Sequence, residues 1–180
     1  YYDTAAPTKS RSLLIDAGVR YRGYCSDITR TIAGVGEGRF AALVQGLEQL
    51  QFRLCKMVAP GVDYLDIHRK THQGIAALLS SAGLVNDLSD EDMVVEGVTR
   101  AFFPHGIGHF LGVQVHDVAG KPVPPPADAP FLRLLRTLEP GMVVTIEPGL
   151  YFIPSLLEPL LSGPFGRYIN RPLLDELQGC

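Results

Sequence analysis

The stretch that decides the fold is LLIDAGVRYRGYCSDITRT, residues 13–31. Apolar and polar residues partly alternate over 12–19 and over 21–32, on either side of a tight turn that contains Gly23, so this stretch predicts a β-hairpin. Asp16 falls in the middle of the first strand and Asp27 in the middle of the second, with ten residues between them. A bare carboxylate among apolar strand residues is costly to bury, so each aspartate needs a cation or a hydrogen-bond donor. The pair alone leaves two interpretations open, a metal site and ordinary turn or edge residues.

Helices are predicted after the hairpin. Apolar residues recur at helical spacing from Phe40 to Val58, and Pro60 and Gly61 end that run. Asp63 is the predicted N-cap of a second helix with Leu65, Ile75 and Leu79 facing inward, which Gly83 terminates. A third short helix is predicted within 86–103, with Ser89 as its cap.

The chain changes character at Pro104, after which glycine, proline and β-branched residues dominate. We expect strands and loops there, and the proline-rich run over 122–130 predicts a stiff surface loop. Strands together with separate helices predict the α+β class.

Composition narrows the kind of protein. A chain of 180 residues predicts one domain, 1–180, and its net charge of −3 argues against nucleic acid or a membrane surface as partner. No run approaches the roughly 18 apolar residues of a membrane span. The three cysteines, Cys25, Cys55 and Cys180, form no disulfide framework, which favours reduced thiols and a cytoplasmic location.

A histidine cluster lies in FFPHGIGHFLGVQVHDVAG, residues 102–120. His105, His109 and His116 are three of the five histidines in the whole chain, so they are harder to dismiss than a lone histidine. One can ligate metal through a neutral imidazole nitrogen, while the others donate hydrogen bonds to developing negative charge. The glycines of this segment allow a close backbone approach or a sharp turn: Gly106, Gly108 and Gly112.

A second histidine pair, His68 and His72, has the spacing of metal ligands on a helix. No glutamate follows the first histidine as it does in zinc proteases, and the pair lies on or beside the predicted apolar stripe. We interpret both residues as structural.

The last candidates lie near PGMVVTIEPGLY, residues 140–151. Glu147 follows a strand-like run, and Arg133 and Arg136 come shortly before it. By itself Glu147 is also consistent with an exposed strand end, and either arginine with an ordinary surface residue. Together, two aspartates, a histidine and a glutamate are the ligand types that hold hard divalent metals, which predicts a dinuclear metal site.

These phrases resemble the pita-bread metallopeptidases, and within them the prolidase (Xaa-Pro dipeptidase) branch. The resemblance runs from YDT at the start to FGRYINRPLL near the end and is carried by GYCSDITRT, PHGIGHFLGVQVHD and TIEPGLYFIPSLL. It implies an α+β fold of two related halves with strands curved around a dinuclear site, and a hydrolase that cleaves dipeptides with C-terminal proline.

The resemblance also implies roles for single residues. Asp16 would ligate one metal ion, Asp27 would bridge both, and His109 and Glu147 would hold the other, with Glu147 also moving a proton. His105 and His116 would face the substrate and stabilise the tetrahedral intermediate. Arg133 matches the family's arginine for the carboxylate of the dipeptide.

Manganese is the metal expected from this oxygen-rich ligand set, with cobalt and zinc as alternatives. Two cations lower the pKa of a bridging water, which then attacks a carbonyl without needing the N–H that a bond to proline lacks. The expected partners are a small peptide substrate and a second copy of the chain in a homodimer.

The sequence departs from the family's pattern in one respect. The family's fifth ligand, a glutamate in a strand of the type IRIED, is not among these 180 residues, nor are a separate N-terminal domain and a first core strand. We therefore expect a catalytic domain trimmed at both ends, which holds its metals weakly and has little activity as it stands.

Other functions stay open on the sequence alone. Aminopeptidase P and methionine aminopeptidase are enzymes of the same fold, and the segment between His109 and His116 favours the dipeptidase over both. A creatinase-like, metal-free enzyme is disfavoured by the four metal-type residues. A non-catalytic peptide-binding scaffold is the alternative outside the enzymes.

Overall fold

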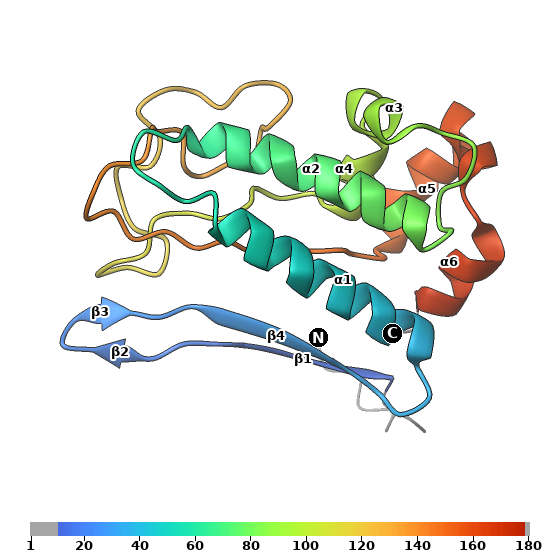
Figure 1. The fold of residues 1–180 in the computed structure, drawn as a ribbon, viewed down its shortest axis with the longest axis horizontal. Coiled ribbons are helices and arrows are strands. Elements are labelled where there is room, and N and C mark those ends of the chain that lie inside the picture. Colours follow the sequence, from blue (N-terminus) through green and yellow to red (C-terminus); the bar gives the residue numbers. More distant parts are fainter. Residues whose placement is uncertain (1–10, 179–180) are drawn as a thin grey trace.

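The predicted hairpin is present in the computed structural model, which describes residues 11–178. Strand β1 (Ser12–Ala17) pairs antiparallel with β4 (Ile28–Ala33), and Asp16 lies opposite Thr29. Two short strands, β2 (Arg20–Tyr21) and β3 (Tyr24–Cys25), continue the ribbon to its tip. Asp27 directly precedes β4. The hairpin runs along one side of the molecule as a long, narrow ribbon (Figure 1).

Two long helices form the body beside the hairpin. Helix α1 (Gly38–Cys55) and helix α2 (Tyr64–Ser81) pack against each other. The Asp63 side chain accepts a hydrogen bond from the Leu65 amide, which confirms the predicted N-cap. Helix α2 buries residues at a spacing of three and four, which is the pattern of a helix with one face in the core: Tyr64, Ile67, His68, Thr71, His72, Ile75, Ala76 and Leu79.

The predicted third helix is two helices. Helix α3 (Asp90–Val95) begins where the Ser89 hydroxyl accepts from the Asp92 amide, as expected of a cap, and helix α4 (Val98–Phe102) follows. Gly97 separates them with a φ of 77°, a left-handed conformation that glycine adopts easily and that a continuing α-helix cannot accommodate.

The segment from Pro104 to Ile153 is irregular, with turns and bends between short extended stretches, and the expected strands are mostly missing from it. Within the described residues, it forms only isolated bridges, which include Asp63 with Thr137 and Phe110 with Val144. The 122–130 stretch is a loop, as predicted. Residues 107–111 do face 143–147 in one antiparallel register, but each facing pair has only one backbone bond, and the His109 amide donates to the Thr145 hydroxyl instead of its carbonyl.

The prediction of strands and loops was wrong for the last part of the chain. Residues 154–177 form helix α5 (Pro154–Ser162), a 3-10 helix η1 (Pro164–Tyr168) and helix α6 (Arg171–Leu177). Pro154 and Pro172 stand at helix starts, where the missing N–H is not needed, whereas Pro159 lies inside α5. Asn170 caps α6 by accepting from the Leu173 amide.

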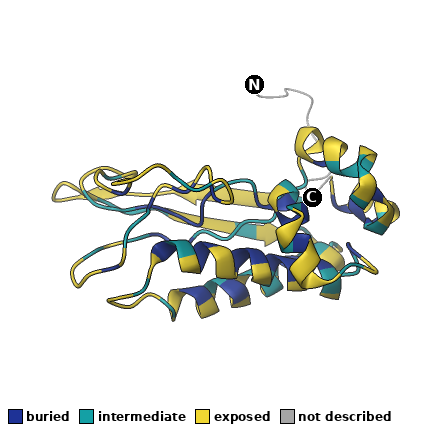
Figure 2. Ribbon diagram, turned by 90° about the horizontal axis from the view of Figure 1, so that it is seen from above, coloured by how far each residue is buried: buried dark blue, intermediate teal, exposed yellow. Residues whose placement is uncertain are grey.

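Burial is uneven between the two layers. Figure 2 shows dark blue residues concentrated on the helices and a mostly yellow hairpin. Four large apolar side chains on one face of the hairpin are about half exposed: Leu13, Ile15, Ile28 and Ile32. The α+β class is confirmed, and the core is built mainly by helices. Among the described residues, no helix has the length and apolar character that crossing a membrane requires.

Candidate metal centre

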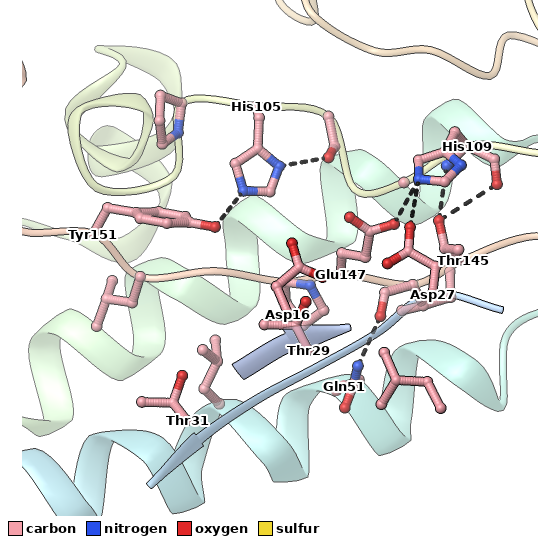
Figure 3. Close-up of a pocket in the computed structure, with 18 of the residues that line it drawn as sticks. Asp16, Asp27, Thr29, Thr31, Gln51, His105, His109, Thr145, Glu147 and Tyr151 are labelled. Carbon is pink, nitrogen blue, oxygen red and sulfur yellow. Dashed lines mark hydrogen bonds and ion pairs between the residues drawn. The ribbon is translucent and has the colours of Figure 1, made fainter. Parts of the chain in front are cut away.

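A cavity of about 1380 Å³ lies between the inner face of the hairpin, helix α1 and the extended segments 104–111 and 144–152. Three predicted ligands meet in it: Asp27 from the hairpin, His109 from the glycine-rich segment and Glu147 from the end of the strand-like run (Figure 3). One donor atom from each lies within 4.8 Å of the other two. The three segments are distant in sequence, so the fold itself assembles this group.

The orientation of the His109 ring suits a ligand. Its Nδ1 atom lies 2.8 Å from the Phe110 carbonyl oxygen, which accepts only if Nδ1 carries the hydrogen. In the neutral ring, Nε2 then presents a lone pair. That atom lies 3.0 Å from Glu147 Oε1 and 3.4 Å from Asp27 Oδ2.

A proton or a metal ion is needed between these atoms. Among the described side chains, three buried polar atoms have no conventional hydrogen-bond partner, and two of them are His109 Nε2 and Glu147 Oε1. A lone pair facing two carboxylates is unfavourable unless a proton or a metal ion lies between them. The donor set of one imidazole and two carboxylates therefore fits a divalent ion.

The charges of the cluster are coupled. Burial lowers the pKa of His109, but the facing Glu147 carboxylate, the Phe110 carbonyl and the charge of Asp27 outweigh it and hold the pKa above its ordinary value. Burial raises the pKa of Glu147, whereas the hydrogen bonds from His109 and Thr145 bring it below its ordinary value. Glu147 is thus kept as a carboxylate, which is the form that binds a metal.

Backbone pairing holds two of the ligands at this distance. The Thr145 amide donates to the His109 carbonyl (3.0 Å), and the Glu147 amide donates to the Ile107 carbonyl (2.7 Å). Gly108 lies between Ile107 and His109. The backbone there comes close to neighbouring atoms, as expected, because a Cβ at Gly108 would meet the Thr145 carbonyl and the Tyr64 hydroxyl.

Asp16 is placed differently from the other predicted ligands. It lines the same cavity from strand β1, and its side chain is visible in Figure 3, but it lies outside the tight group of three. Its role as a ligand therefore stays a prediction.

His105 occupies a second position in the cavity. Its Nε2 atom is 2.9 Å from the Tyr151 hydroxyl, its Nδ1 atom is 2.8 Å from the Gly106 carbonyl, and the Phe103 ring packs edge-on against it (Figure 3). Burial, together with the charges of Glu147 and Asp16, raises the pKa of Tyr151, so this phenol remains a hydrogen-bond donor.

His116 and Arg133 also line the cavity, both on exposed positions. The His116 ring packs edge-on against the His109 ring at a centroid distance of 4.3 Å. Burial and then the positive charges of His109 and Arg133 lower the pKa of His116. At neutral pH this imidazole is therefore neutral and can either accept or donate.

The other histidine pair is buried in the helical core, as the structural interpretation requires. His68 and His72 are 3% and 6% exposed, and His72 Nδ1 lies 2.9 Å from the Thr99 hydroxyl. Burial lowers the pKa of His68 to about 4 and that of His72 to about 3. Both rings are neutral at pH 7.

Several residues in and around the cavity were not predicted. Gln51 on helix α1 donates to the Ile146 carbonyl (2.8 Å), Tyr64 on α2 donates to the Thr145 carbonyl (2.6 Å), and Tyr151 contacts His105. Tyr151 could have been found from its position four residues after Glu147. Gln51 and Tyr64 gave no signal, because their contacts depend on how the helices pack against the extended segments.

Known proteins share this chain's sequence pattern. The profile of metallopeptidase family M24 matches residues 3–170. The Xaa-Pro dipeptidase of Marinobacter nauticus is 76% identical over 180 residues, which is all of this chain and 42% of that protein. The chain therefore spans less than half the length of this curated relative.

Solved structures share the fold as well. An alanine variant of Escherichia coli aminopeptidase P matches with a TM-score of 0.64 and 30% sequence identity, over 79% of this chain and 31% of that one. Zinc-substituted E. coli aminopeptidase P in complex with product matches with a TM-score of 0.62 and 31% identity, over 81% of this chain and 31% of that one.

Proposed function

Because the chain belongs to metallopeptidase family M24, we propose that it carries the metal-binding and substrate-binding residues of an Xaa-Pro dipeptidase. Its fold is the α+β pita-bread fold of that family, over the part that these residues span. The relative at 76% identity carries the name Xaa-Pro dipeptidase, which supports the dipeptidase over other members of the family. We propose residues 1–180 as one catalytic unit.

The observation that carries the proposal is the pair of facing atoms His109 Nε2 and Glu147 Oε1, with Asp27 beside them. These three residues would hold one divalent ion, and Asp16 is proposed as a ligand of a second ion in the same cavity. Manganese is the metal we propose, with cobalt and zinc as alternatives, because oxygen donors outnumber nitrogen donors in this set.

Bound metal ions of this kind supply an activated water and polarise the scissile carbonyl. The chain's own residues would do the rest. Glu147, kept ionised by its neighbours, would accept the proton released by the attacking water at its carboxylate. Neutral His116 would hydrogen-bond the oxygen on which negative charge develops. Both ring nitrogens of His105 are engaged, by the Gly106 carbonyl and the Tyr151 hydroxyl, so its proposed role is to face the substrate within the cavity.

Arg133 is the proposed handle for the substrate's terminal carboxylate. Its guanidinium can bind a carboxylate through two parallel hydrogen bonds, and it lines the cavity near enough to His116 for its charge to lower the pKa of that ring. A carboxylate handle close to the reacting centre would favour dipeptides over longer peptides. Aminopeptidase P, the enzyme named in the matching structures, is the second candidate function.

Metal uptake and hydrolysis of Gly-Pro test this function. They should be measured on this chain and on a longer form that includes the predicted glutamate strand, with a longer Xaa-Pro peptide as the competing substrate. Uptake of about two manganese ions and cleavage of the dipeptide by the longer form would support the dipeptidase.

Preference for the longer peptide would favour aminopeptidase P. If the longer form takes up no metal and cleaves neither substrate, the non-catalytic peptide-binding scaffold is the remaining candidate function. We expect the 180-residue chain to have little activity, and full activity with manganese alone would contradict that expectation.

Two further parts of the proposal concern the setting of the protein. A cytoplasmic location is consistent with Cys25 and Cys55, which are both free thiols. A homodimer is proposed from the resemblance alone, and sedimentation of the purified protein would test it.

A further inference from the structure

Thr145 lies between the two ligands that face each other. It is 7% exposed and stands two residues before Glu147 in an extended segment, so both side chains project to the same side. The Thr145 amide and the His109 carbonyl are hydrogen-bonded at 3.0 Å. Thr145 is therefore bonded to His109 through its backbone and lies two residues from Glu147 in the same segment.

The Thr145 hydroxyl makes contacts to both of these ligand residues. Its Oγ1 atom accepts the His109 amide hydrogen at 3.1 Å (Figure 3). Its own hydrogen can point to the His109 carbonyl, at the long distance of 3.4 Å, or toward the Glu147 carboxylate, whose pKa the hydroxyl helps to lower. The carboxylate is the stronger acceptor because it is charged.

A hydrogen bond from helix α2 fixes the Thr145 backbone. The Tyr64 hydroxyl donates to the Thr145 carbonyl at 2.6 Å, and Tyr64 is fully buried at the start of helix α2. Burial raises the pKa of Tyr64, so the phenol stays protonated and keeps this bond. Gly108 leaves room for the phenol, since a side chain there would collide with it.

We propose that Thr145 is a positioning residue of the metal centre, whose hydroxyl sets the separation of His109 and Glu147. This inference rests on the proposed function, because the separation matters only if the two residues share a cation. A methyl group in place of the hydroxyl would leave the buried His109 amide without its acceptor and the Glu147 carboxylate without a donor. Residues that orient metal ligands typically affect affinity by about tenfold to a hundredfold.

The test compares Thr145→Val, which keeps the shape, with Thr145→Ser, which keeps the hydroxyl. Calorimetric titration with manganese alone should give an affinity at least about tenfold weaker for the valine variant and within about threefold of the unchanged chain for the serine variant. Thr71→Val is the matched control, because Thr71 is equally buried but donates within helix α2 to the Ile67 carbonyl. It should lose stability without losing metal affinity.

An unchanged affinity in Thr145→Val, or an equal loss in Thr71→Val, would overturn the inference. A second readout needs no metal: amide hydrogen exchange at His109 should be faster in Thr145→Val and unchanged in Thr145→Ser. If the unchanged chain binds no manganese in either length, the proposed function fails, and this exchange experiment still decides whether the hydroxyl fixes His109. Equal exchange in both variants would show that it does not.

Discussion

The helical body and the hairpin both contribute residues to the candidate metal centre, but their apolar side chains differ in burial. In the body, Ile75 and Leu79 are fully buried, whereas on the hairpin Ile15 is 47% exposed and Leu13 is 54% exposed. His109 and Glu147 belong to segments that Tyr64 and Gln51 tie to the helices, while Asp27 belongs to the hairpin. The comparison teaches that one side of this centre rests on a buried core and the other on a ribbon whose large apolar side chains stay about half exposed.

The largest expected effect comes from matched truncations in the two regions. Ile75→Ala should lower the free energy of unfolding by about 2–5 kcal/mol, because it opens a cavity in a packed core. Ile15→Ala should cost less than about 1 kcal/mol, since about half of that side chain is in water already. Urea unfolding measures both. Equal losses would mean that the hairpin face is covered in solution.

Metal binding should reduce the difference in local stability between the hairpin and the helical body. Manganese at a hundred times its dissociation constant stabilises the folded state by about 2.7 kcal/mol. Because Asp27 precedes β4, the slowing of amide exchange should be largest over residues 13–32, and chelation should reverse it. Asp27→Asn is the control, in which protection of the hairpin should be lost. Protection spread evenly over the chain would argue against a ligand on the hairpin.

Acid should act on the body through its buried histidines. The pKa values of His68 and His72 lie below that of an unfolded histidine, so the unfolded state binds more protons between about pH 4 and 6.5. Stability contributed by these groups is therefore full above pH 6.5 and falls as the pH is lowered. The carboxylates with lowered pKa values, Glu147 and Asp128, add losses only at lower pH.

His68→Leu isolates this effect. The variant removes a buried Nδ1 atom that has no hydrogen-bond partner, so its stability at pH 7 should be close to that of the unchanged chain. When the pH is lowered from 6 to 4.5, the free energy of unfolding should fall in both proteins, but in the variant the fall should be smaller by up to about 2 kcal/mol. Urea midpoints at the two pH values, in the presence of a chelator, measure the difference. The same pH dependence in both proteins would show that His68 is not buried as a neutral ring.

The smallest expected effect concerns the base of the hairpin. Arg11 binds the Glu37 carboxylate through Nε and Nη2 (3.0 and 2.6 Å) and donates to the Glu176 carbonyl, which joins the hairpin to α1 and α6. Arg11→Ala should cost about 1 kcal/mol, because this pair is partly buried and bidentate. Arg39→Ala should cost less than about 0.5 kcal/mol, because its bond to Glu176 is exposed. Thermal unfolding separates the two, and equal losses would mean that the base of the hairpin has other anchors.

Local patterns predicted much of the fold. The hairpin, helices α1 and α2 and the caps Asp63 and Ser89 follow from alternation, helical spacing and side chains that accept backbone amides. The helices over 154–177 were missed because the glycine, proline and β-branched residues after Pro104 were taken to favour strands and loops, whereas Pro154 and Pro172 stand in the first turn of a helix. The strand before Glu147 was expected, but its pairing depends on segments far away in the sequence.

The candidate site was predictable in its residue types but not in its geometry. Asp27, His109 and Glu147 stood out because each metal-type residue lies in an apolar or glycine-rich context. The contacts of Thr145, Tyr64 and Gln51 could not be predicted, since each joins segments more than thirty residues apart. Sequence patterns give information on residues that are close along the chain, whereas these hydrogen bonds join residues that are close only in the folded structure.

The distance along the chain between the donors has a consequence for synthesis. The ribosome makes Asp27 first, and 120 further residues must follow before Glu147 exists. At about 5–20 residues per second, that interval is roughly 6–24 s. During this time the hairpin and its half-exposed apolar face are already made, and His109 has no carboxylate from Glu147 to face. The centre can therefore close only after Glu147 has been made, and the nascent hairpin must stay unaggregated until then.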